Sequence, residues 1–143
     1  PSMRVDLIVN DFCLKAFHDK VLVVFEGHFR RNFISINDVS KAFTYALSNF
    51  QNMKSEVYNL GHDKSNMTKI KLANLVASKL KARKTHVDIV ELEFSKDPDK
   101  RDYMVSNEKL GNKGFKATED VGGGIENILK AYSMMPKTIF GNV

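Results

Sequence analysis

Residues 30–42 read RRNFISINDVSKA, a short β-rich run that passes directly into a helix whose start carries Asn37 and Asp38. The run begins with two arginines, Arg30 and Arg31. A guanidinium group is planar and permanently charged, so its donors match the oxygens of a phosphate. An arginine beside a rigid strand–helix junction is therefore a candidate anion-binding group.

A second stretch, residues 97–103, reads DPDKRDY and supplies another arginine, Arg101. A single arginine can hold one phosphate, whereas two arginines from separate segments can hold two linked phosphates. Taken together, the two stretches predict a two-arginine grip on a diphosphate. The remaining sequence has to indicate which molecule carries it.

Composition is that of a globular protein. The chain has 143 residues, of which 43% are apolar and 27% charged, and we expect one domain over residues 1–143. No apolar stretch approaches the roughly 20 residues that a membrane span needs. The net charge is +5, but 22 basic residues are interleaved with 17 acidic ones, so the pattern does not favour nucleic-acid binding.

The chain has one cysteine, Cys13, in an apolar helical stretch. It excludes an intrachain disulfide framework and indicates a reducing compartment, most simply the cytoplasm, with Cys13 as a core residue. Nothing resembles a signal peptide. A chain that opens on Pro1 and runs at once into a structured pattern reads as a fragment or a processed piece.

Hydrophobic periodicity predicts alternating helices and strands, and therefore an α/β fold. Either Asn37 or Asp38 is expected to cap the second helix, and either Ser65 or Thr68 the third. The basic run 79–84 is expected to be the solvated end of that third helix. The expected helices cover residues 5–17, 39–50, from 65 or 68 to 80, 106–110 and 121–132, and the expected strands cover 21–25, 33–36, 57–61 and 87–94.

Several catalytic and metal-binding patterns are missing from the sequence. Residues 122–124 are three glycines, but they follow no predicted strand and lack the G-x-G-x-x-G spacing of a dinucleotide loop. The four histidines are scattered, which predicts no metal site. No tyrosine has a lysine four positions later, and no G-x-S-x-G motif occurs. We therefore predict no catalytic, cofactor-binding or metal-binding residue in this chain.

Four motifs, in order, carry a resemblance to a known family: PSMRVDLIVNDF at 1–12, RNFISINDV at 31–39, VYNLG at 57–61 and DPDKRDY at 97–103. They resemble the C-terminal part of the NAD-dependent epimerase/dehydratase family, extended short-chain dehydrogenases that act on nucleotide sugars. The similarity covers nearly the whole chain. It implies an α/β C-terminal substrate-binding lobe with some closing elements of the Rossmann domain.

The resemblance also implies roles for the two arginines. In the enzymes that the chain resembles, the arginine at the position of Arg31 contacts the diphosphate, and the one at the position of Arg101 closes over it. The plain alternatives are a solvent-facing charge for Arg31, and for Arg101 a surface ion pair with Asp97, Asp99 or Asp102.

Two further substrate-binding residues follow from the same resemblance. Asn10 would bond the phosphate or the sugar, and its alternative is a polar position on a buried helix. Phe25 would lie against the nucleobase, and its alternative is a core residue. Asp38 is expected to cap a helix and position the Arg31 strand, because a carboxylate beside a diphosphate would repel it. Asn59 and Gly61 are expected to shape a turn.

In this family a Tyr-x-x-x-Lys pair and bound NAD or NADP perform the hydride chemistry. Both would belong to an N-terminal half that this sequence lacks. The chain is therefore expected to be the nucleotide-sugar-binding half, catalytically incomplete alone, which docks on a Rossmann half in the same polypeptide or as a cleaved partner. Family enzymes often dimerise through Rossmann helices that this chain lacks, and a homo-oligomer stays open.

Two other classes of function stay open. The first is a non-catalytic interaction module derived from the same fold, and the second is a small nucleic-acid binder that uses residues 79–84 and 96–101. A large apolar face left by a missing half would favour the fragment. Strong loss of binding with salt would favour the nucleic-acid binder.

Overall fold

The computed structural model describes residues 4–92 and 101–134. The chain divides into two compact units, and each is described below by itself. The first unit comprises residues 1–28, 68–99 and 122–143, and the second comprises 29–67 and 100–121. The expected single domain stays a prediction.

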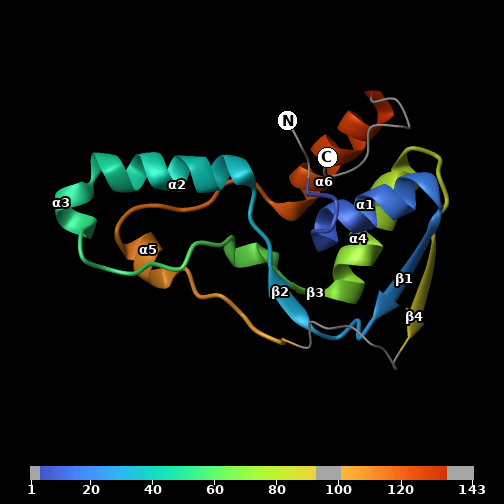
Figure 1. The fold of residues 1–143 in the computed structure, drawn as a ribbon, viewed down its shortest axis with the longest axis horizontal. Helices are drawn as coiled ribbons and strands as arrows, with labels where there is room; N and C mark the ends of the chain where they lie inside the picture. Colours follow the sequence, from blue (N-terminus) through green and yellow to red (C-terminus); the bar gives the residue numbers. More distant parts are fainter. Residues whose placement is uncertain (1–3, 93–100, 135–143) are drawn as a thin grey trace. The chain divides into compact units, whose positions relative to one another are not determined.

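The first unit is built on two parallel strands. β1 (Val21–Phe25) pairs with β4 (Asp88–Leu92) in a register that aligns Val21 with Asp88 and Phe25 with Leu92. The helices of this unit are α1 (Ile8–His18), α4 (Lys69–Ala82) and α6 (Val121–Met134) (Figure 1). Both strands and all three helices were predicted from the sequence, although α1 begins later than expected and residues 93 and 94 lie outside the described part.

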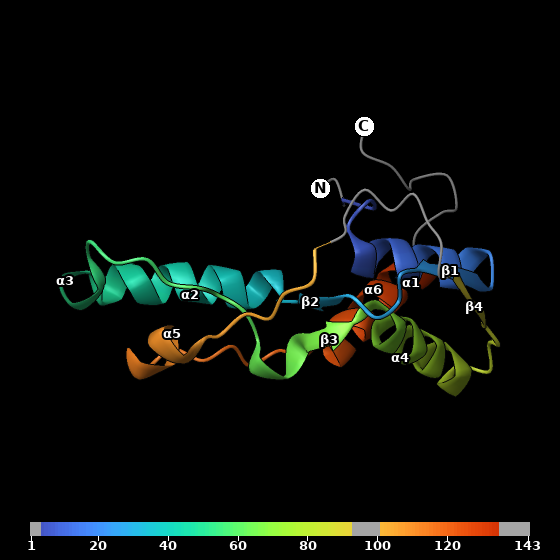
Figure 2. The same ribbon diagram turned by 90° about the horizontal axis from the view of Figure 1, so that it is seen from below.

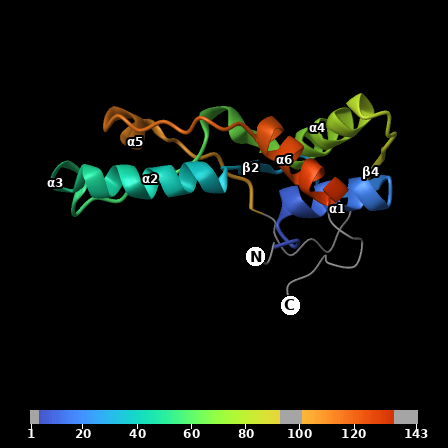
Figure 3. The same cartoon turned by 90° about the horizontal axis from the view of Figure 1, so that it is seen from above.

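The core of the first unit lies between one face of the strands and the helices. Leu22 and Val24 point into it, and α6 lies beside both α1 and α4 (Figures 2 and 3). The Tyr132 hydroxyl on α6 donates to the Asn10 carbonyl on α1 at 3.4 Å. The other buried apolar residues are Phe12, Cys13, Ala16, Leu72, Ala73, Val76, Leu80, Val87, Ile125 and Leu129.

The opposite face of the two strands is apolar and partly exposed. Its side chains, which we call the outer sheet face, are between 37% and 43% exposed. They are Val21, Val23 and Phe25 on β1 and Val90 and Leu92 on β4. A parallel pair of strands normally has both faces covered.

Two features fix the ends of α4. The Thr68 hydroxyl accepts a hydrogen bond from the Lys71 amide at 3.3 Å, which confirms Thr68 as one of the two predicted caps. At the other end Arg83 pairs with Glu126 of α6 at 2.7 Å, and Lys79 pairs with the same carboxylate at 3.3 Å. Residues 81–84 of this basic end are exposed, as predicted, and the ion pairs with Glu126 also tie the helix to α6.

The second unit contains β2 (Arg30–Asn32), α2 (Ile36–Ser48), α3 (Phe50–Met53), a 3₁₀ helix η1 (Asp63–Ser65), β3 (Asn66–Thr68) and α5 (Glu108–Asn112). β2 and β3 form a two-stranded sheet. α5 lies beside the C-terminal half of α2 (Figure 2). The small core comprises Met53, Leu110 and Phe115, with Ala42, Tyr45, Ala46, Tyr58 and Leu60 packed against it.

Three details of this unit differ from the prediction. The predicted strand 33–36 was wrong, because β2 ends at Asn32 and Ile36 already begins α2. Ser35 caps α2, since its hydroxyl accepts from the Asn37 amide at 3.2 Å. The predicted strand 57–61 was wrong: these residues belong to no strand, although Tyr58 and Leu60 pack against the small core.

None of the helices over the described residues is long and apolar enough to cross a membrane.

Candidate substrate-binding site

Arg31 is a buried, fixed cation. Only 7% of the residue is exposed, and its Nη1 donates to the Arg30 carbonyl at 2.8 Å. Its guanidinium also lies over the Tyr103 ring, 5.2 Å from the ring centroid. A planar cation stacked on an aromatic ring loses little further freedom on binding an anion. The structure excludes the alternative of a solvent-facing charge.

The segment 101–103 lies alongside β2 (Figures 1 and 2). The Arg30 amide donates to Asp102 Oδ1 at 2.8 Å, and the Arg30 guanidinium pairs with the same carboxylate at 2.9 and 3.0 Å. The Tyr103 amide in turn donates to the Arg30 carbonyl at 3.5 Å. The structure therefore brings together the two arginine motifs that are far apart in the sequence.

Arg30 has a local role in this arrangement. Its hydrogen bonds and ion pair with Asp102 raise the pKa of its guanidinium and hold the segment 101–103 in place. Arg101 is exposed and precedes Asp102, whose carboxylate is engaged by Arg30. Asp97, Asp99 and Lys100 lie outside the described residues.

Asp38 does not cap a helix, so that prediction was wrong. It lies within the first turn of α2, is fully buried, and accepts hydrogen bonds from the Thr118 and Glu119 amides, both at 2.8 Å. The Thr118 hydroxyl and the Lys41 ammonium also reach it, at 3.1 and 3.2 Å. Burial raises the pKa of this carboxyl, but the hydrogen bonds from Glu119, Lys41 and Thr118 outweigh burial and lower it.

The start of α2 is thereby tied to residues 118–119. The Ser35 hydroxyl donates to the Glu119 carboxylate at 2.5 Å, and the side-chain Nδ2 of Asn37 donates to it at 3.1 Å. These two hydrogen bonds lower the pKa of the Glu119 carboxyl. The helix that follows the Arg31 strand is therefore anchored at its first turn, which keeps the strand–helix junction rigid.

Gly61 sits where two backbone segments approach closely. A Cβ atom there would lie 2.2 Å from Asn32 Oδ1. The Asn32 side chain needs that space, because it donates to the His62 carbonyl at 3.0 Å and accepts from the His62 amide at 3.2 Å. Gly61 thus lets the loop dock on β2, and Asn59 contacts Ser106 in the neighbouring segment.

The other two predicted residues, Asn10 and Phe25, belong to the first unit. The Asn10 amide donates to the Arg4 carbonyl at 2.8 Å, which closes the turn before α1. Phe25 is 41% exposed on the outer sheet face, so it is not a core residue. Their contacts with a nucleotide sugar stay predictions.

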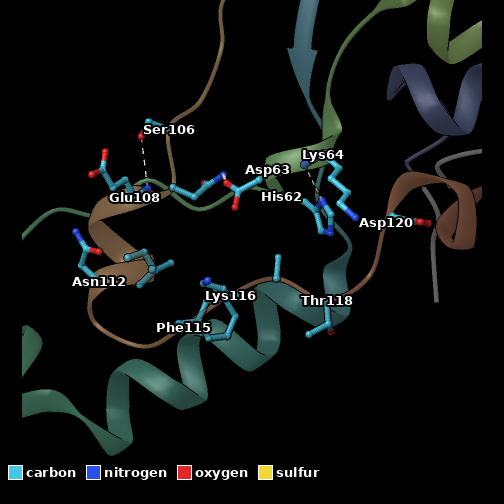
Figure 4. Close-up of a pocket in the computed structure, with 15 residues that line it drawn as sticks. His62, Asp63, Lys64, Ser106, Glu108, Asn112, Phe115, Lys116, Thr118 and Asp120 are labelled. Atoms are coloured by element: carbon cyan, nitrogen blue, oxygen red, sulfur yellow. Dashed lines mark hydrogen bonds between the residues drawn. The ribbon is translucent and has the colours of Figure 1, made fainter.

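A cavity of about 660 Å³ lies in the second unit, between the loop after Leu60, α5 and residues 115–120. His62, Lys64 and Asp120 lie at one end and Asn112 at the other (Figure 4). Its size suits a small molecule, but its lining mixes lysines with carboxylates and includes neither Arg31 nor Arg101. Over residues 4–92 and 101–134, no cluster of three or more His, Cys, Asp or Glu side chains can hold a metal ion.

The sequence matches no known family model. Solved structures with the same fold include RMD from Pseudomonas aeruginosa complexed with NADPH, with a TM-score of 0.74 and 18% identity over 94% of this chain and 45% of that one. UDP-N-acetylglucosamine 4-epimerase from Bacillus cereus has a TM-score of 0.70 and 20% identity over 93% of this chain and 45% of that one. A dTDP-glucose 4,6-dehydratase from Bacillus anthracis in complex with NAD has a TM-score of 0.69 and 18% identity over 91% and 40%.

This chain therefore spans less than half the length of these three structures. The similarity confirms the predicted fold class: the chain has an α/β fold that matches part of each of these three structures.

Proposed function

We propose that this chain is the nucleotide-sugar-binding half of an NAD(P)-dependent nucleotide-sugar epimerase or dehydratase and is catalytically incomplete alone. One observation supports the proposal: Arg31 is buried against Tyr103, and the pairing of Arg30 with Asp102 holds the segment that contains Arg101 alongside β2. Two arginine-bearing segments that are far apart in the sequence thus lie side by side next to an anchored strand–helix junction. A diphosphate is the anion that this arrangement suits.

The three arginines of this site, Arg30, Arg31 and Arg101, would have different roles. The charge of Arg30 is offset by Asp102, so Arg30 organises the site. Arg31 would offer the diphosphate a donor whose position is already fixed by packing. Arg101, which is exposed, would close over the second phosphate. Asn10 and Phe25 would add contacts to the sugar or phosphate and to the nucleobase, respectively.

The outer sheet face supports the second part of the proposal, a Rossmann half as partner. Parallel strands occur almost only in sheets that are covered on both faces, and a two-stranded sheet is marginal alone. The partner would supply further strands, the covering helices and the site for NAD or NADP. It could belong to the same polypeptide or be a separate chain. The alternative, an interaction module, shares the apolar face but needs no phosphate grip.

Calorimetric titration with UDP-glucose, UDP-N-acetylglucosamine, dTDP-glucose and GDP-mannose tests the proposal. We expect at least one to bind, and Arg31→Lys and Arg101→Ala each to weaken it by roughly 10- to 100-fold, because each removes charge-assisted hydrogen bonds. Arg83→Ala is the matched control, since that arginine pairs with Glu126 in the first unit. Circular dichroism verifies the fold of each variant. If no nucleotide sugar binds, the interaction module replaces this proposal.

A further inference from the structure

The cavity of the second unit is lined by a buried histidine that has one unused nitrogen. His62 is only 9% exposed, and its ring points into the cavity of about 660 Å³ (Figure 4). Its Nδ1 accepts a hydrogen bond from the Lys64 amide at 3.2 Å. A neutral imidazole has one acceptor and one donor nitrogen, so Nε2 carries the proton and is a donor. Over residues 4–92 and 101–134, nothing accepts a hydrogen bond from this Nε2.

The position of this donor is fixed by the fold. The bond from the Lys64 amide to the His62 ring caps η1, so the ring cannot turn away without leaving that amide unpaired. A buried donor that lacks an acceptor costs stability, and native proteins rarely leave one unpaired. The Nε2 of His62 therefore calls for an acceptor that enters the cavity.

Two lysines favour an acceptor with negative charge. Lys64 lies beside His62, and Lys116 lies on the wall formed by residues 115–117 (Figure 4). Within the part of the chain that the structure describes, neither ammonium group has an ion pair or a hydrogen bond. A charged acceptor makes stronger hydrogen bonds with such donors than a neutral one does. The unused polar groups at this end of the cavity thus match an anion.

The carboxylates of the lining limit how much negative charge the anion can carry. Asp63 accepts from the Asn107 side chain at 2.9 Å, and Asp120 has a hydrogen bond or ion pair of its own. The Glu108 carboxylate points away from His62 (Figure 4). These groups leave the donors of the cavity free, but their charge would repel a doubly charged phosphate more than a singly charged carboxylate.

One wall of the cavity is apolar. Leu110 and Phe115 line it and belong to the small core of the unit, where they are 6% and 9% exposed. The Phe115 ring is supported by the Tyr45 ring, with the two centroids 5.6 Å apart. A flat apolar group packs well against an aromatic ring. Small-molecule sites commonly combine such a wall with a few fixed polar groups.

We propose that this cavity binds a small organic monocarboxylate with a flat apolar body. The carboxylate accepts from His62 Nε2 and pairs with Lys64, and the apolar body packs against Phe115. Every residue of the site belongs to the second unit, and neither Arg31 nor Arg101 lines the cavity. The site is therefore separate from the diphosphate grip, and the inference does not rest on the proposed nucleotide-sugar function.

Benzoate is the probe, and benzamide is its matched neutral analogue with the same ring. Ligand-observed NMR measures their affinities, because ligands of this size bind at roughly millimolar concentrations. We expect benzoate to bind about 10-fold more tightly than benzamide, because only benzoate brings a charged acceptor to the two donors. Equal binding of the two, or no binding of benzoate, would overturn the proposal. Displacement of benzoate by an equal concentration of inorganic phosphate or UDP-glucose would also overturn it.

Two variants place the probe in the cavity. Lys64→Gln removes the charge of an exposed side chain, and His62→Asn removes Nε2 while its amide oxygen takes the position of Nδ1 and keeps the cap. We expect each to weaken benzoate binding by about 5- to 10-fold. Lys54→Gln is the matched control, because that exposed lysine lies outside the cavity and donates to Gln51. Circular dichroism verifies each fold. Binding that survives unchanged in both cavity variants would refute the site.

Discussion

Replacement of Asp38 by alanine is expected to destabilise the second unit strongly. The carboxylate is fully buried and accepts two backbone hydrogen bonds, from Thr118 and Glu119, both at 2.8 Å. Hydrogen bonds to a charged group contribute roughly 1.5–3 kcal/mol each, and the substitution also leaves both amides without their acceptor. Lys41 loses its buried partner as well. We therefore expect a loss of about 3–5 kcal/mol in the free energy of unfolding.

Urea unfolding followed by circular dichroism measures this loss. Asp19→Ala is the control, because that aspartate is exposed at the C-terminal end of α1 and its replacement should change stability by no more than about 0.5 kcal/mol. Asp38→Asn keeps the shape of the side chain but replaces one acceptor oxygen with an NH₂ donor. It should therefore also lower the free energy of unfolding. If Asp38→Ala costs less than about 1 kcal/mol, the anchoring argument is wrong.

The same carboxylate predicts a pH dependence. Its pKa in the folded chain is lower than its ordinary value of 3.8, so the unfolded chain binds its proton more readily. The stabilisation is therefore complete above pH 3.8 and is lost as the pH falls through the lower, folded-state pKa. Asp38→Asn should flatten the acid limb of a stability–pH curve, and an unchanged limb would contradict the assignment.

Three further predictions concern other parts of the fold. Gly61→Ala should cost about 1–3 kcal/mol because the new methyl group overlaps the side-chain oxygen of Asn32, and Asn32→Ala in the same chain should recover part of that loss in urea unfolding. Cys13 should react with a thiol reagent only after denaturant unfolds the chain, because its pKa is raised to about 12 by burial; fast labelling of the native chain would contradict its place in the core. Glu126→Gln should cost less than about 1 kcal/mol in thermal unfolding, and the cost should shrink further in high salt, because the ion pair with Arg83 is partly exposed.

Much of the first unit could be predicted from local pattern. The β-branched run at β1 and the apolar spacing of α1 and α4 each identify one element, because the same side chains that pack in the core set the period. Thr68 could be named as a candidate cap because capping is also local: its hydroxyl accepts from the Lys71 amide three residues later. The pairing of the Arg31 and Arg101 stretches was suggested by their shared chemistry.

The rest depends on contacts between residues far apart in the sequence. Asp38 looked like a helix cap because nothing near it in the sequence shows that residues 118–119 return to it. Residues 57–61 have the pattern of a strand, but a strand needs a neighbouring strand to pair with, and the local pattern does not show whether one is there; here only Tyr58 and Leu60 pack against the small core. Ser35 was missed as a cap since Asn37 and Asp38 are equally good candidates. The cavity near His62 lies between the loop after Leu60, α5 and residues 115–120, and hydrophobic periodicity does not show that these segments meet.

The diphosphate grip is tested most directly by phosphorus NMR of UDP-glucose in the presence of this chain. We predict that wild-type chain broadens or shifts both phosphorus signals, that Arg101→Ala largely removes the change, and that the Arg83→Ala control behaves as wild type. Unchanged phosphorus signals with the folded wild-type chain, or the same change with Arg101→Ala, would contradict the two-arginine account.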